Sequence, residues 1–307
     1  MAEFLQNQKT IITGISGQLG SALLIAFGQA PCTGLDRSQL NLDDPGSIEA
    51  VLDALKPSLI INPAAYTAVD KAESDPEQAF RVNAESVGIM ARWCARNHAL
   101  FVHYSTDYVF DGKKPTPYVE TDDPCPLSVY GKSKYAGEQA IIASSCRHLI
   151  FRTSWVAGMR GNNFIRTILR LAQDRDSLRV VNDQVGSPTA AELIARTTLQ
   201  VLEKANEHEV SGLFHLTASN STTWFDYAQY IVQRARQLGL ATQLGPEGIN
   251  PIPSTEYPVP APRPMNSCLN TRKLCQWLDI SGLPVWQQDI DPIIDHLTYM
   301  LMQGTPS

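Results

Sequence analysis

Tyr130 and Lys134 stand four residues apart and could act together as an acid–base pair. This spacing is one turn of a helix, so the phenol and the ammonium would share a helix face. A free tyrosine titrates near pH ~10 and is a poor acid at neutral pH. A nearby ammonium favours the phenolate, so we expect Lys134 to lower the pKa of Tyr130. Beside a bound dinucleotide, the pair predicts carbonyl reduction or alcohol oxidation.

A glycine-rich turn near the N-terminus predicts the dinucleotide site. It occupies residues 13–20, after a short apolar run and before apolar residues at helical spacing. Gly14 permits a tight bend, Gly17 lets the backbone approach a pyrophosphate, and Gly20 lets the helix pack on the sheet. The N-terminus of that helix offers free N–H groups and a positive dipole to phosphates.

Two charged residues after the second apolar run bear on the choice of cofactor. Asp36 would accept a hydrogen bond from the adenosine ribose 2′-OH and favour NAD. Arg37 would pair with a 2′-phosphate and favour NADP. Because both are present, the sequence predicts NADPH with NADH as the alternative, and solvated charges at a strand end remain the other interpretation of both residues.

Composition and charge argue against several classes of protein. The 307 residues carry a net charge of -6, and the pI is about 5.5, whereas a nucleic-acid-binding protein usually presents a basic face. Apolar runs fall short of the ~18 residues that span a bilayer, and residues 1–9 lack the apolar core of a signal peptide. We therefore predict a cytoplasmic protein with neither nucleic-acid nor membrane partners. The six cysteines lack metal-ligand spacing, which argues against a zinc site.

Strand and helix patterns alternate through the first half of the chain. Apolar runs predict strands at residues 10–13, 32–35, 59–61, 100–105 and 148–152, with helices between them. Such alternation predicts an α/β fold with a Rossmann-type doubly wound parallel sheet, which binds ligands at the carboxyl ends of its strands.

The second half is less regular and predicts a second, smaller α/β domain. We expect residues 1–155 to form the NAD(P)-binding domain, with a returning segment near 185–220. Residues 156–307 would mainly form a discontinuous substrate-binding domain. Residues 250–264 contain six prolines, which predict an extended loop.

Collinear motifs over nearly the whole chain carry a resemblance to a known family. The most specific is the string at residues 64–73, which reads Ala-Ala-Tyr-Thr-Ala-Val-Asp-Lys-Ala-Glu. Further matching segments are residues 17–20, 82–84, 104–112, 124–126, 130–134, 152–155, 183–189 and 263–269. The chain resembles the extended short-chain dehydrogenase/reductase superfamily and, within it, the dTDP-4-dehydrorhamnose reductase family.

The resemblance implies reduction of the 4-keto group of dTDP-4-dehydro-β-L-rhamnose to dTDP-β-L-rhamnose. By analogy, the catalytic residues would be Thr106, Tyr130 and Lys134. The cofactor would contact Gly17, Gln18, Leu19, Asp36, Ala65, Tyr66 and Tyr104. The sugar nucleotide would face Thr67, Val69, Asp107 and Trp155. Where the family usually has Asp near adenine, this chain has Asn41 before Leu42, and an amide can still bond the adenine amino group.

Three points are left open by the residues themselves. Arg263, in the proline-rich segment, could donate its fork to a diphosphate or be a solvated loop residue. Some family members dimerise through a metal bound by glutamates, and Glu192 matches one ligand. Ser21 and Ala22 occupy the position of another, so we predict no metal. The protein would be a monomer or a homodimer.

Two other functions compete with the first. A reductase of a related dTDP-4-keto-6-deoxy sugar would share all these motifs. A non-catalytic NADP-binding regulatory subunit would not need Thr106, Tyr130 and Lys134, which are present here. Dehydratases of the superfamily have Thr-Asp-Glu where this chain has Thr-Asp-Tyr, so the second carboxylate needed to expel water is missing.

Overall fold

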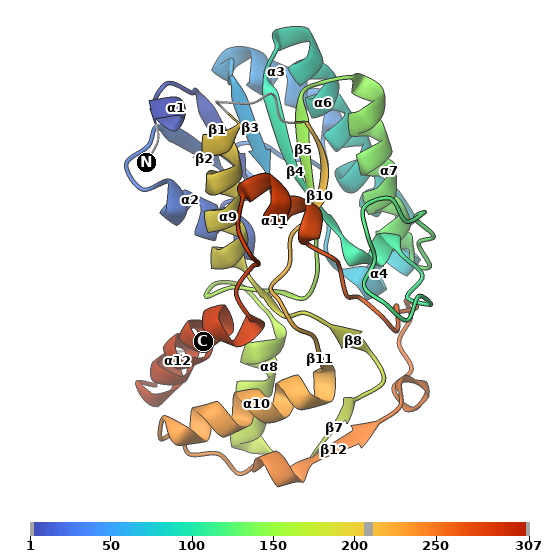
Figure 1. The fold of residues 1–307 in the computed structure, drawn as a ribbon, viewed down its shortest axis with the longest axis vertical. Helices are drawn as coiled ribbons and strands as arrows, with labels where there is room; N and C mark the ends of the chain where they lie inside the picture. Colours follow the sequence, from blue (N-terminus) through green and yellow to red (C-terminus); the bar gives the residue numbers. More distant parts are fainter. Residues whose placement is uncertain (1–2, 206–210, 305–307) are drawn as a thin grey trace.

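A six-stranded parallel sheet forms the centre of the protein, in a computed structural model that describes residues 3–205 and 211–304 (Figure 1). The strands lie in the order β10-β5-β4-β3-β1-β2, and all neighbours are parallel. Their bounds are β1 (Thr10–Thr13), β2 (Cys32–Leu35), β3 (Leu59–Asn62), β4 (Leu100–Thr106), β5 (His148–Thr153) and β10 (Gly212–His215). The predicted doubly wound parallel sheet is confirmed.

Helices cover both faces of this sheet. On β1, Ile12 belongs to the apolar cluster with α2 and α9, and Ile11 belongs to the cluster on the opposite face with α3, α6 and α7. Both faces are therefore buried, which explains why the strands lack polar alternation. The covering helices are α2 (Gln18–Phe27) and α9 (Ala191–Lys204) on one face and α3 (Pro45–Leu55), α6 (Ser86–Asn97) and α7 (Val129–Ser144) on the other.

The sixth strand comes from the second half of the chain. β10 follows α9 and pairs with β5, where Phe214 lies opposite Phe151. α9 packs against α2, and α11 (Arg272–Leu278) contacts both α9 and β10. The division of the chain into two domains stays a prediction.

The segment before α6 contains a π-helical turn. Asp75 caps α5 (Pro76–Phe80) by accepting a hydrogen bond from the Gln78 N–H at 3.3 Å. The π turn, η1 (Arg81–Glu85), then joins α5 to α6. Such turns are frequent at functional sites, and this one directs Asn83 toward the loop after β3. The Asn83 amide bonds both the N–H and the C=O of Tyr66.

The remaining elements lie mainly in the lower half of Figure 1. The described residues include three pairs of short strands: β6 (Val156–Ala157) with β9 (Thr189–Ala190), β7 (Leu178–Val181) with β12 (Ile249–Ile252), and β8 (Val185–Gly186) with β11 (Thr222–Thr223). The other helices are α1 (Glu3–Gln6), α4 (Val69–Ser74), α8 (Phe164–Asp174), α10 (Trp224–Gln237) and α12 (Trp286–Met302), with the 3-10 turns η2 (Asp107–Val109), η3 (Pro246–Gly248) and η4 (Ser254–Glu256).

The expectation of an extended loop at residues 250–264 is wrong at its start. Asn250 and Pro251 lie in β12, opposite Arg179 and Val180 of β7. Proline cannot donate to a strand ladder, but an edge strand has one side without a ladder. Because β7 and β12 form a two-stranded sheet, both strands are edges, and the proline is accommodated there.

Candidate active site

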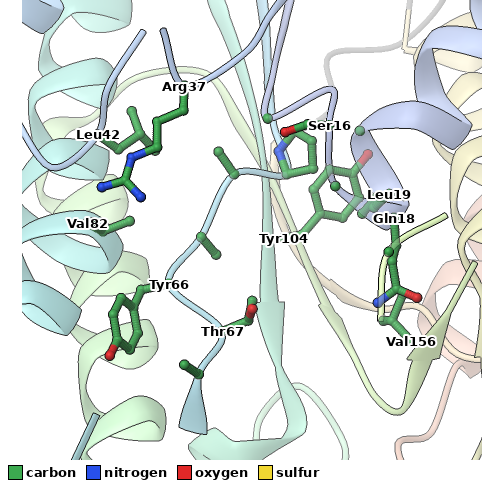
Figure 2. Close-up of a pocket in the computed structure, with 18 of the residues that line it drawn as sticks. Ser16, Gln18, Leu19, Arg37, Leu42, Tyr66, Thr67, Val82, Tyr104 and Val156 are labelled. Atoms are coloured by element: carbon green, nitrogen blue, oxygen red, sulfur yellow. The ribbon is translucent and has the colours of Figure 1, made fainter. Parts of the chain in front are cut away.

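A cavity of about 730 Å³ opens at the carboxyl ends of the central strands (Figure 2). It brings together most of the residues predicted from the sequence: Gly14, Gly17, Gln18, Leu19, Gly20, Arg37, Asn41, Leu42, Ala65, Tyr66, Thr67, Tyr104, Tyr130 and Lys134. Six predicted residues are not among those that line it: Asp36, Val69, Thr106, Asp107, Trp155 and Arg263. The individual roles of all these residues stay predictions.

The glycine turn provides a surface that fits a pyrophosphate. A Cβ atom on Gly20 would lie 2.2 Å from the Gly14 carbonyl oxygen, so this crossing of the turn and α2 requires glycine. The first N–H groups of α2 lack partners within the helix, and Gln18, Leu19 and Gly20 of this turn line the cavity. Gln18 links α2 to the segment at residues 158–163, because its Oε1 accepts from the Gly158 N–H at 2.9 Å and from Asn163 Nδ2 at 3.1 Å.

The two candidate selectors of the adenosine ribose differ in orientation. Asp36 caps its own turn, where Oδ1 accepts from the Ser38 N–H at 2.8 Å and the Ser38 hydroxyl at 2.6 Å. These hydrogen bonds lower the pKa of Asp36. Arg37 instead extends along the cavity wall beside Leu42, with its Nε 3.3 Å from Asn41 Oδ1 (Figure 2). The cavity therefore presents a guanidinium at this end, 3.4 Å from the Asp43 carboxylate that also lines it.

Tyr130 is presented by a helix that packs closely on the loop after β4. Ser128 caps α7 by accepting from the Gly131 N–H at 3.1 Å. A Cβ on Gly131 would lie 2.2 Å from the Tyr108 carbonyl oxygen, so a larger residue would push the helix away. The Tyr130 ring meets Tyr108 edge-on, with 5.5 Å between centroids.

The pKa of Tyr130 moves in the direction opposite to the expectation. Burial raises it to about 12, a nearby Asp107 carboxylate adds to the rise, and the Thr106 hydroxyl opposes it. Lys134 does not lower it, because its ammonium turns into the sheet, 2.7 Å from the Tyr104 carbonyl oxygen and 3.2 Å from His103 Nε2. A pKa near 12 keeps the phenol protonated at neutral pH, which is the state that a proton donor needs.

Lys134 is buried at the floor of the cavity. Its side chain is 2% exposed, and burial lowers its pKa to about 8, while Glu138 one turn further along α7 opposes the shift. Glu138 itself forms a buried two-point ion pair with Arg152 of β5, at 2.9 and 2.6 Å. On the side facing the sheet, the Lys134 ammonium is held by the Tyr104 carbonyl oxygen and His103 Nε2.

Thr106, the last residue of β4, and Asp107, the first of η2, lie together at the end of the strand. The Thr106 hydroxyl donates to Asp107 Oδ1 at 2.9 Å and accepts from the Tyr108 N–H at 3.2 Å. Burial raises the pKa of Asp107 to about 6. Among the described residues, Asp107 Oδ2 has no hydrogen-bond partner.

Two residues predicted to face the substrate have other partners. Trp155 stacks on Trp224, with centroids 3.5 Å apart and an interplanar angle of 11°. Arg263 forms an ion pair with Asp70 at 2.7 Å and donates to the Ala261 carbonyl at 2.6 Å. The fork of Arg263 is thus directed at Asp70, and its contact with a diphosphate stays a prediction.

The sequence analysis assigned no role to four polar residues in and behind the cavity. Ser105 and Thr153 line it, and their buried hydroxyls have no partner in the described part of the chain. Asn62 and His103 lie fully buried behind it. The available signal was a polar residue inside a strand that is buried on both faces, since such a group needs a partner.

Comparisons with known proteins agree with this geometry. The family described as RmlD substrate binding domain matches residues 8–299. The dTDP-4-dehydrorhamnose reductase of Escherichia coli K12 is 43% identical over 295 residues, which cover 94% of this chain and 97% of that protein. The protein of the same name from Salmonella typhimurium LT2 is 46% identical over 258 residues, covering 84% and 85%. The chain belongs to the dTDP-4-dehydrorhamnose reductase family.

Solved structures of dTDP-4-dehydrorhamnose reductases share the whole fold. The Bacillus anthracis reductase, solved in complex with NADP, is 30% identical with a TM-score of 0.85, covering 93% of this chain and 98% of that one. The Clostridium acetobutylicum reductase is 32% identical with a TM-score of 0.86, covering 96% and 99%. The predicted family, fold class and enzyme class are confirmed.

Two structural observations bear on membrane and metal partners. Within residues 3–205 and 211–304, no helix combines the length and apolarity needed to cross a bilayer. In the same residues, no group of three or more histidine, cysteine or acidic side chains is arranged to hold a metal. The absence of a metal, the cytoplasmic location and the choice between monomer and homodimer stay predictions.

Proposed function

We propose that this protein reduces the 4-keto group of dTDP-4-dehydro-β-L-rhamnose to give dTDP-β-L-rhamnose, with NADPH as the cofactor. One observation carries the proposal: Tyr130 and Lys134 line the same cavity as the glycine turn. The named activity of the 43% identical Escherichia coli protein supports the choice of sugar. The NADP bound to the Bacillus anthracis protein supports the choice of cofactor.

The cavity fits this cofactor in three places. The close crossing of the turn and α2 at Gly20 supports a pyrophosphate site, and Arg37 in the cavity lining supports a 2′-phosphate site. At the other end, the unpartnered hydroxyls of Ser105 and Thr153 offer hydrogen bonds to the nicotinamide half. We assign the predicted cofactor contacts to the lining residues on this basis.

The chemistry requires a proton donor at the ketone oxygen. Bound NADPH supplies the hydride. Tyr130, protonated at neutral pH, donates its proton to the oxygen. Thr106 orients that oxygen when its hydroxyl proton turns from Asp107 Oδ1 to the ketone. Lys134 holds the nicotinamide ribose from the cavity floor. We assign Thr67, Val69, Asp107, Trp155 and Arg263 to the sugar nucleotide by the family resemblance, and of these Thr67 lines the cavity.

The deciding experiment follows the absorbance of NADPH or NADH with enzymatically prepared dTDP-4-dehydrorhamnose. We expect oxidation with NADPH and formation of dTDP-rhamnose, identified by mass and chromatography against an authentic standard. Binding of the cofactor without oxidation would refute the reductase assignment for this sugar. A panel of related dTDP-4-keto-6-deoxy sugars would then separate a reductase of another sugar from a regulatory subunit.

Arg37 should set the preference for NADPH. Arg37→Leu removes the guanidinium that faces the 2′-phosphate, and a hydrogen-bonded charge pair of this kind contributes about 10- to 100-fold in affinity. We expect that loss for NADPH and an unchanged affinity for NADH, measured by fluorescence titration. Arg96→Leu is the matched control, because Arg96 forms a surface ion pair with Glu49 away from the cavity. An equal loss for both cofactors would contradict the assignment.

A further inference from the structure

A row of four buried polar side chains runs behind the cavity. Thr13 Oγ1 lies 2.6 Å from Asn62 Oδ1, Asn62 Nδ2 lies 3.1 Å from His103 Nδ1, and His103 Nε2 lies 3.2 Å from Lys134 Nζ. The row crosses β1, β3 and β4 and ends on α7. None of the four side chains is more than 2% exposed.

The row ends on fixed backbone groups. At one end, Thr13 Oγ1 accepts from the Ala64 N–H at 3.3 Å. At the other end, Lys134 Nζ donates to the Tyr104 carbonyl oxygen. Polar groups in a buried sheet are costly unless all are satisfied, and an apolar residue at position 103 would avoid that cost. The packing of the sheet therefore does not explain His103, whereas its contact with Lys134 does.

The imidazole can serve Lys134 in both of its protonation states. When Nζ is charged, it donates to His103 Nε2, and the His103 Nδ1–H then needs the oxygen of the Asn62 amide. When Nζ is neutral, it accepts from the Nε2–H, and Nδ1 accepts from the amide nitrogen. Rotation of the Asn62 amide exchanges the two arrangements, and the Thr13 hydroxyl can donate or accept.

We propose that His103, held by Asn62 and Thr13, is a positioning residue that fixes the Lys134 ammonium at the floor of the cofactor cavity. This inference rests on the proposed function, because it gives Lys134 the task of holding the nicotinamide ribose. With Tyr104 and His103 occupying two of its N–H groups, Lys134 keeps the third for the cavity.

Several charged or titratable groups face Lys134 and influence its protonation state. On its own helix these are Tyr130 and Glu138, and on β4 it is His103. Arg152 of β5 offsets the charge of Glu138 through their ion pair. Burial holds the pKa of His103 well below its ordinary value, so the imidazole is neutral. It accepts from the charged lysine in the arrangement that turns the Asn62 amide oxygen toward Nδ1.

The test compares His103→Leu with His103→Gln. Leucine removes the acceptor, which favours loss of the Lys134 proton, and a hydrogen bond to a charge is worth about one pKa unit. We expect the alkaline loss of NADPH affinity, followed by fluorescence titration against pH, to move down by about one pH unit. We also expect kcat to fall about tenfold at an unchanged KM for the sugar. Glutamine can place an amide oxygen near the position of Nε2. His103→Gln should therefore keep most of the wild-type kcat and a pH profile close to that of the wild type.

Two further variants keep the result interpretable. Thr13→Val, which leaves Lys134 and His103 in place, should give a smaller shift in the same direction and also decides the matter if His103→Leu does not fold. His215→Gln is the matched control, because His215 is equally buried on β10 but bonds the Tyr118 carbonyl. It should change the melting temperature without moving the pH profile.

The inference would be overturned if His103→Leu and Thr13→Val lowered the melting temperature but left the pH profile of NADPH binding unchanged. The four polar side chains would then only stabilise the fold. An equal effect of His103→Leu and His103→Gln would also overturn the inference. Since NADPH binding is measured without turnover, a shifted binding profile in a protein that reduces no sugar would reject the proposed function and keep the role of His103.

Discussion

Replacement of Tyr130 by phenylalanine is expected to lower kcat about a thousandfold while NADPH binds as before. Phenylalanine keeps the edge-on contact with Tyr108 and removes only the proton donor. With its pKa raised to about 12, the wild-type phenol stays protonated throughout the neutral range, so the loss should be nearly independent of pH there. Single-turnover oxidation of bound NADPH measures the chemical step directly.

Tyr108→Phe is the matched control for this experiment. Its ring lies against Tyr130, and burial raises the pKa of its phenol as well, yet we assign it no proton transfer. If Tyr130→Phe turned over as fast as the wild type, the acid would have to be another group. An equally large loss in Tyr108→Phe would point to packing of the two rings rather than to proton donation.

Glu138→Leu is expected to lower the free energy of unfolding by about 3–5 kcal/mol. Glu138 and Arg152 are 1% and 3% exposed, and the change would leave a buried guanidinium without its carboxylate. Arg152 Nη1 already lacks a partner among the described residues, so no further acceptor is at hand. Denaturant unfolding followed by circular dichroism gives the value.

The double variant Glu138→Leu with Arg152→Met distinguishes an unpaired charge from a packing defect. Well-packed apolar pairs often replace buried ion pairs without loss, so the double variant should recover most of the stability. Glu49→Leu, which breaks the exposed pair with Arg96, should be near neutral. A double variant as unstable as Glu138→Leu alone would mean that the cavity left by the side chains, and not the charge, sets the cost.

The sheet and the cofactor wall were predictable because local patterns determine them. The apolar runs of the central strands are short and continuous, as burial on both faces requires. The glycine turn was predictable because only glycine fits at position 20, where α2 crosses the turn. The four-residue spacing of Tyr130 and Lys134 predicted a shared helix, and α7 contains both residues.

Contacts between distant segments were not predictable in the same way. Lys134 turns to Tyr104 and His103, and nothing in its own helix specifies those partners. Arg263 meets Asp70 across the fold, and Trp155 meets Trp224, so neither could be paired from local sequence. Pro251 misled the prediction, because whether a proline can join a strand depends on which edge of a sheet it occupies.

The position of β10 bears on how the protein is made. During synthesis, β5 is complete long before β10 exists, so its outer edge has no strand to pair with. The face that α9 covers is equally bare at that stage. The ribosome must therefore synthesise the chain as far as His215 before the six-stranded sheet can be completed. We expect a fragment that stops at residue 155 to aggregate through the unpaired edge of β5.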